Sequence, residues 1–328
     1  MKPIICLGIE STAHTFGVGI VDSKGKILAN VKDAFTTRQG GIIPVQVADH
    51  HYRCANSVLS DALTKARIKL DDIDLIAFSQ GPGIGATLNV GAVTARTLSQ
   101  RLKIPLTGVN HCIAHLEIGK LRTKAKDPVL LYASGANTQV ITWQEGAFRI
   151  MGESLDIGVG NFLDVYARDL GLGFPGGPLV EKLALKGKNY IELPYVVKGM
   201  DVSFGGILTN LKQKIASKKY SKQDLCYSAQ ETVFAMLIEV SERAMAHAGK
   251  KELLLGGGVA CNKRLQEMAK RMCKERQAKS FCPENEFLVD NGAMIAWNGI
   301  VNHKKHLFTK LKNSGIKPYL RLEDPLFG

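Results

Sequence analysis

The stretch NHCIAH, residues 110–115, places two histidines four positions apart. If this stretch is helical, His111 and His115 share one face and can bind one metal ion. In zinc peptidases a glutamate follows the first histidine and acts as general base. Here that position is Cys112, and a thiol with a pKa of about 8.5 is a poor substitute. The spacing is compatible with half of a metal site, but it equally describes two ordinary helix histidines, one buried and one solvated.

Two histidines leave a tetrahedral or octahedral site short of ligands. Oxygen donors are candidates to complete it. The stretch LVDNGAMIAW places Asp290 at the start of an expected helix, where a carboxylate would be held rigidly. The alternative role for Asp290 is to cap that helix.

The composition is that of a chain with a large core. Of its 328 residues 45% are hydrophobic, and the length suggests about two domains. No apolar run approaches the roughly 18–20 residues that span a bilayer, and the start MKPIICLGIEST reads as a buried strand rather than a signal peptide. Seven scattered cysteines without a CxxC pair indicate a reducing compartment. We therefore expect a cytoplasmic protein with no membrane partner.

Basic residues exceed acidic ones, giving a formal net charge of +13 and a pI near 9.4. Much of the excess lies in three runs, residues 211–222, 262–279 and 302–317. Clustered Lys and Arg are typical of a protein that binds a polyanion. Few aromatic residues interleave with these runs, so a folded RNA or a duplex backbone is expected rather than stacked single-stranded bases.

The order of expected elements repeats along the chain. Residues 4–34 read as three strands in a meander, and a helix follows after Pro44. The same pattern of strand, turn and strand restarts at residues 128–134. Residues 10–12 in the first copy correspond to residues 134–136 in the second. This repeat predicts an α/β fold of two lobes, produced by duplication of a β-meander followed by helices.

Turns at corresponding places in the two lobes could bind a nucleotide in a cleft between them. A tight turn between strands offers backbone N–H groups to phosphates. The triple glycine of GGGVACN, residues 256–262, allows close approach to a bulky ligand. In this order the motifs match the actin, hexokinase and heat-shock-protein ATPase (ASKHA) architecture. We place the N-terminal lobe at residues 1–107 with 303–328, and the C-terminal lobe with helical insertions at 108–302.

Seven motifs occur in order: GIESTAHTFGVGI, SQGPGIGATLNVG, NHCIAHLEIG, YASGANTQV, DIGVGNFLDVYARDLGLGFPGGPLVEKLA, GGGVACN and DNGAMIAW. Over about residues 4–302 the chain resembles the universal threonylcarbamoyl-adenosine tRNA transferase family, the catalytic subunit of the KEOPS complex, in its archaeal and eukaryotic branch. Members of this family were once described as sialoglycoprotein endopeptidases. The resemblance implies an acyltransferase with the two-lobed ATPase fold.

The resemblance implies one divalent metal ion per chain, with iron expected and zinc as the second choice. The family's ligands are two histidines, a tyrosine and an aspartate, which map onto His111, His115, Tyr132 and Asp290. NHCIAH would then be half of a nitrogen-and-oxygen site rather than an incomplete peptidase motif.

The resemblance also implies ATP or threonylcarbamoyl-AMP as a nucleotide ligand. The positions carried over are Tyr132, Ala133, Ser134, Gly135 and Ala136 at the phosphates, Asp164, Gly177 and Glu181 at the ribose and base, and Asn262 at the adenosine. Without the resemblance, Asp164 and Glu181 read as helix-surface charges. Ala136 replaces the family's usual second glycine, which would cost roughly 1 kcal/mol if that position needs a positive φ.

The implied reaction transfers the threonylcarbamoyl group from threonylcarbamoyl-AMP to the N6 amine of the adenine next to the anticodon, position 37, in tRNAs that read codons beginning with A. The resemblance implies a separate adenylate-forming enzyme that supplies the donor. It also implies tRNA and other KEOPS subunits as partners: a small atypical kinase-like protein, a small dimerising subunit and a tRNA-binding subunit. No motif assigns a catalytic side chain.

Three alternatives stay open at the level of sequence. A metallopeptidase would use His111 and His115 but lacks the glutamate. A sugar or acetate kinase on the same fold would need a catalytic carboxylate, for which Glu10 is the candidate. A non-catalytic ATP-binding scaffold would not depend on a metal.

Overall fold

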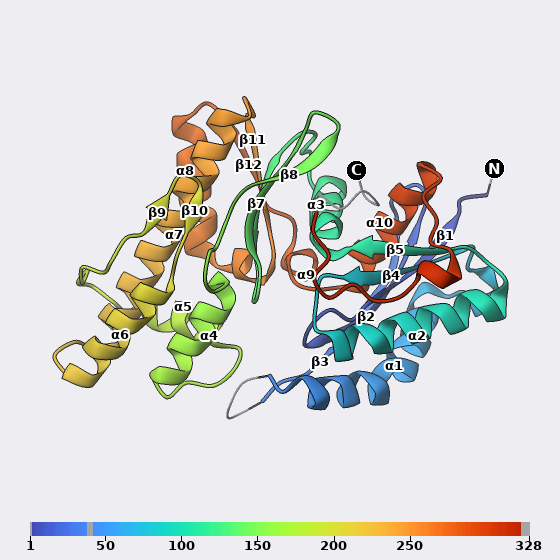
Figure 1. Ribbon diagram of the computed structural model, residues 1–328, viewed down its shortest axis with the longest axis horizontal. Coiled ribbons are helices and arrows are strands. Elements are labelled where there is room, and N and C mark those ends of the chain that lie inside the picture. Colours follow the sequence, from blue (N-terminus) through green and yellow to red (C-terminus); the bar gives the residue numbers. More distant parts are fainter. Residues whose placement is uncertain (1, 38–41, 323–328) are drawn as a thin grey trace. The chain divides into compact units, whose positions relative to one another are not determined.

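The computed structural model describes residues 2–37 and 42–322, which form two compact units (Figure 1). The described residues divide into a first unit of 2–35, 42–122 and 290–322 and a second unit of 36–37 and 123–289. The predicted boundaries were 107/108 and 302/303, so the observed ones differ. They differ because the helices that begin at His111 and Gly292 pack on each other in the first unit. Both histidines of NHCIAH and Asp290 therefore belong to one unit.

The first unit is built on a mixed sheet of order β3-β2-β1-β4-β5. Its strands are β1 (Ile5–Glu10), β2 (Thr15–Asp22), β3 (Ile27–Ala34), β4 (Leu75–Gly81) and β5 (Leu106–Asn110). The meander β1-β2-β3 is antiparallel, whereas β1, β4 and β5 run parallel. Its helices are α1 (Pro44–Ala66), α2 (Gly85–Leu102), α3 (His111–Arg122) and α10 (Gly292–Lys304), with short 3-10 turns η1 (Leu70–Asp72) and η3 (Leu311–Asn313).

The second unit is built on a sheet of order β12-β11-β6-β7-β8. Its strands are β6 (Val129–Ala133), β7 (Thr138–Gln144), β8 (Ala147–Glu153), β11 (Glu252–Gly256) and β12 (Lys279–Phe281), and a separate hairpin joins β9 (Val197–Lys198) to β10 (Asp201–Val202). Its helices are α4 (Val159–Asp169), α5 (Gly176–Ala184), α6 (Gly205–Ser217), α7 (Lys222–His247), α8 (Lys263–Glu275) and α9 (Asn285–Leu288), with a 3-10 turn η2 (Gly258–Cys261). Much of α7 is buried in the core of this unit.

The two sheets have the same topology. Strands β1, β2, β3, β4 and β5 correspond to β6, β7, β8, β11 and β12 in order and in direction. Residues 10–12 and 134–136 therefore lie at corresponding places, at the end of the first strand of each sheet. The predicted duplication is confirmed.

Glycines on one face of the first sheet determine where α10 lies. Side chains alternate along β1, and Leu7 and Ile9 point into the core that α1 and α2 cover. On the opposite face, Gly8 and Gly19 are register partners. A Cβ atom on Gly8 would lie 2.1 Å from the nitrogen of Ala296, and one on Gly19 would lie 2.0 Å from the nitrogen of Ala293. The backbone of α10 thus touches the sheet backbone, which places the residues just before α10 beside the ends of β1 and β5.

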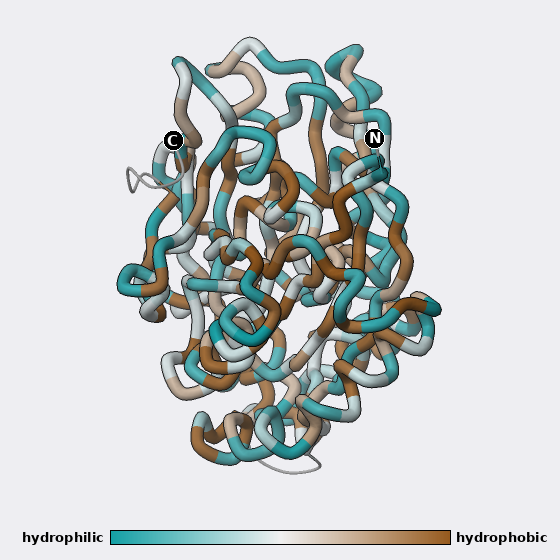
Figure 2. Tube along the Cα trace, turned by 90° about the vertical axis from the view of Figure 1, so that its right-hand side faces the viewer, coloured by the Kyte–Doolittle hydropathy of each residue, from teal (hydrophilic) through white to brown (hydrophobic). Residues whose placement is uncertain are grey.

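Hydrophobic residues are distributed in many short stretches along the chain (Figure 2). Within residues 2–37 and 42–322, no helix is long and apolar enough to cross a membrane.

Candidate metal centre and nucleotide-binding region

The helix α3 presents both histidines on one face. Strand β5 ends at Asn110, whose buried side-chain oxygen accepts hydrogen bonds from the backbone nitrogens of Cys112 (2.9 Å) and Ile113 (3.3 Å). This cap starts α3 at His111. One turn later His115 stacks edge-on against His111, with ring centroids 4.8 Å apart. The predicted helical spacing is confirmed.

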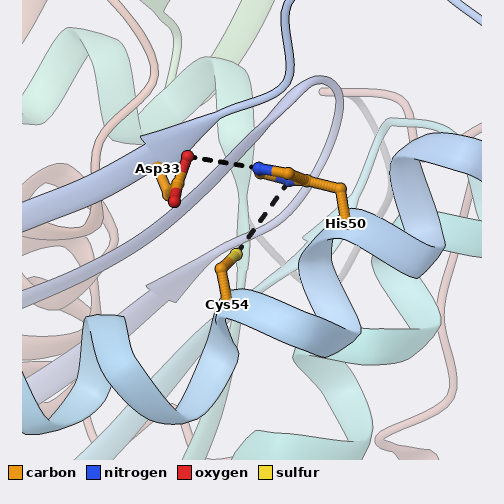
Figure 3. A group of neighbouring side chains, drawn as sticks. All are labelled: Asp33, His50 and Cys54. Carbon is orange, nitrogen blue, oxygen red and sulfur yellow. Dashed lines mark hydrogen bonds and ion pairs between the residues drawn. The ribbon is translucent and has the colours of Figure 1, made fainter.

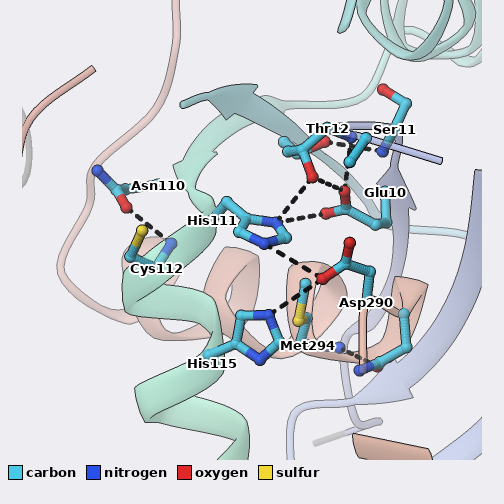
Figure 4. A network of polar contacts seen from close by, with 12 residues as sticks. Glu10, Ser11, Thr12, Asn110, His111, Cys112, His115, Asp290 and Met294 are labelled. Atoms are coloured by element: carbon cyan, nitrogen blue, oxygen red, sulfur yellow. Dashed lines mark hydrogen bonds and ion pairs between the residues drawn. The ribbon is translucent and has the colours of Figure 1, made fainter. Parts of the chain in front are cut away.

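Asp290 faces the two histidines from the residue before the cap of α10 (Figure 4). Its Oδ1 lies 3.4 Å from Nε2 of His111 and 3.4 Å from Nε2 of His115. The cap of α10 is Asn291, whose side chain accepts from the backbone nitrogen of Met294 at 3.0 Å. The alternative in which Asp290 caps the helix is therefore wrong.

Glu10 is a site residue that the sequence analysis did not place at the metal centre. It ends β1 with a fully buried carboxylate. Its Oε2 lies 3.0 Å from Nδ1 of His111. Its Oε1 accepts hydrogen bonds from the backbone nitrogen (2.6 Å) and the hydroxyl (2.5 Å) of Thr12. The signal in the sequence was an acidic residue closing the otherwise apolar strand IICLGIE.

The charges of this cluster are mutually dependent. Burial lowers the pKa of His111, but the carboxylates of Glu10 and Asp290 outweigh it and raise that pKa to about 10. Burial lowers the pKa of His115, and the neighbouring Asp290 offsets only part of that effect. Burial raises the pKa of Asp290, but the two histidines more than compensate and hold it well below 3.8. The two histidine rings therefore supply the positive charge next to the carboxylates of Glu10 and Asp290.

These residues fit a divalent metal ion. Ligand atoms of His111, His115 and Asp290 all lie within 4.8 Å of one another. Bonds of 2.0–2.2 Å in a tetrahedral site would place ligand atoms about 3.4 Å apart, which matches the two measured distances to Asp290. Two imidazoles and one carboxylate form a donor set typical of zinc and of non-haem iron. Glu10, on the other nitrogen of His111, occupies the place of a carboxylate that orients a metal-binding histidine.

Tyr132 belongs to the second unit. It lies on β6, almost fully buried, and pairs with Gln139 on β7 and Gly256 on β11. Its role as a further metal ligand stays a prediction.

The candidate phosphate turn joins β6 to β7 in the second unit. Ser134 closes it, because its nitrogen and its hydroxyl both donate to the carbonyl oxygen of Asn137, at 2.9 and 3.0 Å. Gly135 and Ala136 form an exposed tip. Ala136 does not adopt a positive φ, so the strain considered for alanine at this position does not arise.

The start of α4 packs directly on this turn. The nitrogens of Gly160 and Asn161 donate to the carbonyl oxygens of Ser134 and Gly135, each at 2.9 Å. These two helix N–H groups are therefore already hydrogen-bonded to the turn and are not available to a phosphate.

The other candidate nucleotide residues gather near the same edge of the second sheet. Asp164 accepts from the nitrogen of Gly176, next to Gly177, at 2.7 Å. Glu181 accepts from the nitrogen of Lys263 at 2.8 Å. Asn262 caps α8: its oxygen accepts from Arg264 and Leu265, and its amide donates to Gln230 at 2.8 Å. Each polar side chain thus has a structural partner, and a contact with nucleotide stays a prediction.

The triple glycine has a packing role. Gly257 has φ +87°, and a Cβ there would lie 2.3 Å from the carbonyl oxygen of Ala133. The glycine is therefore required for contact with the end of β6. At Gly258 the nearest atom to an added Cβ is 3.8 Å away. Gly258, unlike Gly257, therefore has open space beside its backbone for a ligand.

Comparison with known structures defines the class of fold. HypF from T. kodakarensis has a TM-score of 0.66 at 17% identity, covering 95% of this chain and 50% of that one. This similarity and the duplicated sheets show that the chain has the predicted α/β fold with a repeated β-meander and helices.

Comparison with known sequences defines the family. A family model described as tRNA N6-adenosine threonylcarbamoyltransferase matches residues 26–297. A protein of that name from Thermococcus kodakarensis is 53% identical over 321 residues, 98% of each chain. A probable bifunctional tRNA threonylcarbamoyladenosine biosynthesis protein from Methanosarcina mazei is 50% identical over 327 residues, 99% of this chain and 59% of its own length. The chain belongs to the tRNA N6-adenosine threonylcarbamoyltransferase family, and the predicted transferase class is confirmed.

Proposed function

We propose that this chain transfers the threonylcarbamoyl group of threonylcarbamoyl-AMP to the N6 amine of adenine 37 in tRNAs that read codons beginning with A. The amine attacks the carbamoyl carbon, the bond from that carbon to the phosphate oxygen breaks, and AMP leaves. The observation that carries the proposal is the convergence of His111, His115 and Asp290, with Glu10 behind them, in a chain of this family.

The metal centre would be held by His111, His115 and Asp290, with Tyr132 as a further ligand. When bound, a divalent ion, iron or zinc, supplies Lewis-acid polarisation of an acyl or phosphoryl oxygen. Asp290 contributes a negative charge, and each histidine directs its Nε2 at the same point. Glu10 accepts a hydrogen bond from Nδ1–H of His111, which would fix the tautomer that leaves Nε2 as the ligand atom.

The nucleotide would lie against the edge of the second sheet where the candidate residues gather. Gly135 and Ala136 form an exposed turn tip whose backbone N–H groups suit a phosphate. Asp164 and Glu181 have carboxylates suited to ribose hydroxyls, and Gly177, Gly258 and Asn262 lie on the same set of elements.

The contacts around the metal centre argue against the peptidase and kinase alternatives. Burial raises the pKa of the Cys112 thiol to about 12, so it is no general base at neutral pH. Glu10, which also contacts His111, is hydrogen-bonded to Thr12 and to the imidazole, which argues against a catalytic role for its carboxylate.

Nucleoside mass spectrometry tests the proposal. The chain would be incubated with partner subunits, the adenylate-forming enzyme, ATP, threonine, bicarbonate and unmodified tRNA. We expect threonylcarbamoyladenosine with the wild type and none with His111→Ala/His115→Ala. Product from both would remove the metal from the chemistry, and product from neither, with partners shown to be competent, would favour the scaffold alternative.

The remaining partners and the location follow from the same proposal. A tRNA-modifying enzyme of this family would work in the cytoplasm with tRNA and the other KEOPS subunits, the small atypical kinase-like protein, the small dimerising subunit and the tRNA-binding subunit. Reconstitution with and without each subunit would show which of them the reaction requires.

A further inference from the structure

A second cluster of metal-ligating side chains lies in the first unit, where α1 faces β3 (Figure 3). Ligand atoms of Asp33 on β3 and of His50 and Cys54 on α1 all lie within 4.8 Å of one another. Nε2 of His50 is 3.1 Å from Oδ1 of Asp33. Sγ of Cys54 is 4.0 Å from Nδ1 of His50. On α1 the histidine and the cysteine are four residues apart, so they share one helix face.

The neighbouring His51 makes this cluster rich in lone pairs. Nε2 of His51 lies 3.0 Å from the carbonyl oxygen of Ala13. A carbonyl oxygen only accepts, so this nitrogen carries the proton, and in the neutral ring Nδ1 carries the lone pair. That Nδ1 lies 3.3 Å from Nδ1 of His50.

A neutral His50 ring cannot satisfy both of its neighbours. With its proton on Nε2 it bonds Asp33, but its Nδ1 lone pair then faces the lone pair of His51. With its proton on Nδ1 it bonds His51, but its Nε2 lone pair then faces the carboxylate. A metal ion bound to Nε2 of His50 removes this conflict, because Nδ1 can then donate to His51 while Asp33 becomes a second ligand of the ion. The adjacent Cys54 adds a sulfur donor, and thiolate is a strong zinc ligand.

We propose that Asp33, His50 and Cys54 form a second metal-binding site, for a zinc-type divalent cation, separate from the centre at His111, His115 and Asp290. Carboxylate oxygen, imidazole nitrogen and thiolate sulfur all belong to the zinc ligand set. Zinc bonds of about 2.0–2.1 Å to nitrogen and 2.3 Å to sulfur imply ligand separations of about 3.3–3.7 Å in a tetrahedral site. The 3.1 Å between Nε2 of His50 and Oδ1 of Asp33 is close to this range. The 4.0 Å of Cys54 is measured to the other ring nitrogen, Nδ1, and one nitrogen of His50 lies within 4.8 Å of the ligand atoms of both Asp33 and Cys54.

The surroundings suit an ion that enters from solvent. Cys54 is buried, His50 is partly buried, and Asp33 is exposed, so the carboxylate lies on the open side. Three protein ligands leave the fourth position to water. On binding, the S–H bond of Cys54 breaks, a sulfur–metal bond forms, and the proton passes to the buffer. The ion would link the first turns of α1 to the end of β3.

Cobalt substitution tests this site separately from the first one. The chelator-treated full chain would be titrated with Co²⁺, because a cobalt–thiolate bond gives a charge-transfer band that nitrogen and oxygen ligands do not give. We expect two Co²⁺ per chain and this band in the wild type. The variant Cys54→Ser should bind one Co²⁺ and lose the band, and His111→Ala/His115→Ala should bind one and keep it.

Control variants make the result specific. Cys282→Ser, at a partly buried cysteine of the second unit, should keep the band. Asp33→Asn changes an exposed side chain, with little risk to folding. It should weaken the affinity of the second site for Co²⁺ by about 10-fold or more. No band in the wild type, or the same band in Cys54→Ser, would overturn the proposal.

Discussion

Glu10 and His111 are joined at the nitrogen that does not face the metal centre: Oε2 of Glu10 lies 3.0 Å from Nδ1, while Nε2 of the same ring lies 3.4 Å from Asp290. The first strand of the sheet thereby orients a ligand on the helix that follows its fifth strand. A single carboxylate at the end of β1 thus couples the fold of the first unit to the geometry of the site.

Replacing Glu10 by Gln should weaken metal binding. The amide oxygen can accept from His111 only if the amide nitrogen faces the donors of Thr12, so the negative charge and one acceptor are lost. The imidazole then becomes a poorer ligand, and removal of such a partner costs about 10–100-fold in metal affinity. Metal titration monitored by mass spectrometry or calorimetry would measure the change. Activity should recover at high metal concentration, which a misfolded protein would not show. The control is Glu117→Gln, because Glu117 on α3 pairs with Lys120 outside this network.

Alanine at Gly19 should destabilise the first unit. Its Cβ would lie 2.0 Å from the nitrogen of Ala293, and two backbones cannot separate without moving α10. Overpacking of this kind costs about 3 kcal/mol or more of unfolding free energy, which denaturant unfolding would measure. At Gly206 on α6 an added Cβ meets nothing within 4 Å, so Gly206→Ala should be neutral or stabilising by up to about 1 kcal/mol. Equal effects of the two substitutions would contradict the role given to Gly19.

The cap that Asp156 provides for α6 should fail in acid. Burial raises the pKa of Asp156, but hydrogen bonds from the backbone nitrogens of Phe204, Gly205 and Ile157 outweigh it and hold the pKa below 3.8. The folded protein binds the proton of Asp156 less tightly than the unfolded chain does, so the charged cap contributes its full stabilisation above pH 3.8. That stabilisation is lost as the pH falls through the lowered pKa of Asp156.

Asp156→Asn removes the charge from this cap. We expect it to lower the unfolding free energy at neutral pH by about 1 kcal/mol and to flatten its decline below pH 4. Denaturant unfolding at several pH values would show both effects. Asp61→Asn, at an exposed position of α1, should leave the curve unchanged.

Exposed lysines of α8 should contribute to tRNA binding if the proposed function holds. Arg271 pairs with Glu275 at 3.0 Å, whereas Lys270 and Lys274 are exposed on the same helix. The double charge reversal Lys270→Glu/Lys274→Glu should weaken tRNA binding. It should also reduce the slope of log K against the logarithm of salt concentration by up to about 2. Filter binding over a range of salt concentrations would measure this. Lys65→Glu/Lys69→Glu, at the end of α1 and just before η1, carries the same charge change outside the basic runs. Equal losses in both variants would indicate only a general charge effect.

The sequence alone determined the repeating order of elements and suggested half of the candidate metal centre. The period of polar and apolar residues predicted two copies of one meander, because alternation and helical spacing are local properties of the chain. His111 and His115 could be paired from their spacing, since residues four apart on a helix always share a face. Asp290 could be named as a candidate but not separated from a helix cap.

Only the tertiary structure decided which residues complete that centre. Asp290 faces the histidines because Asn291 takes the capping role and because Gly8 and Gly19 let α10 lie directly on the sheet. Glu10 joins His111 across 101 positions of sequence, and Asp33 meets His50 through the packing of α1 on β3. No local pattern encodes such contacts, since they depend on which strands become neighbours and on how closely two backbones can approach.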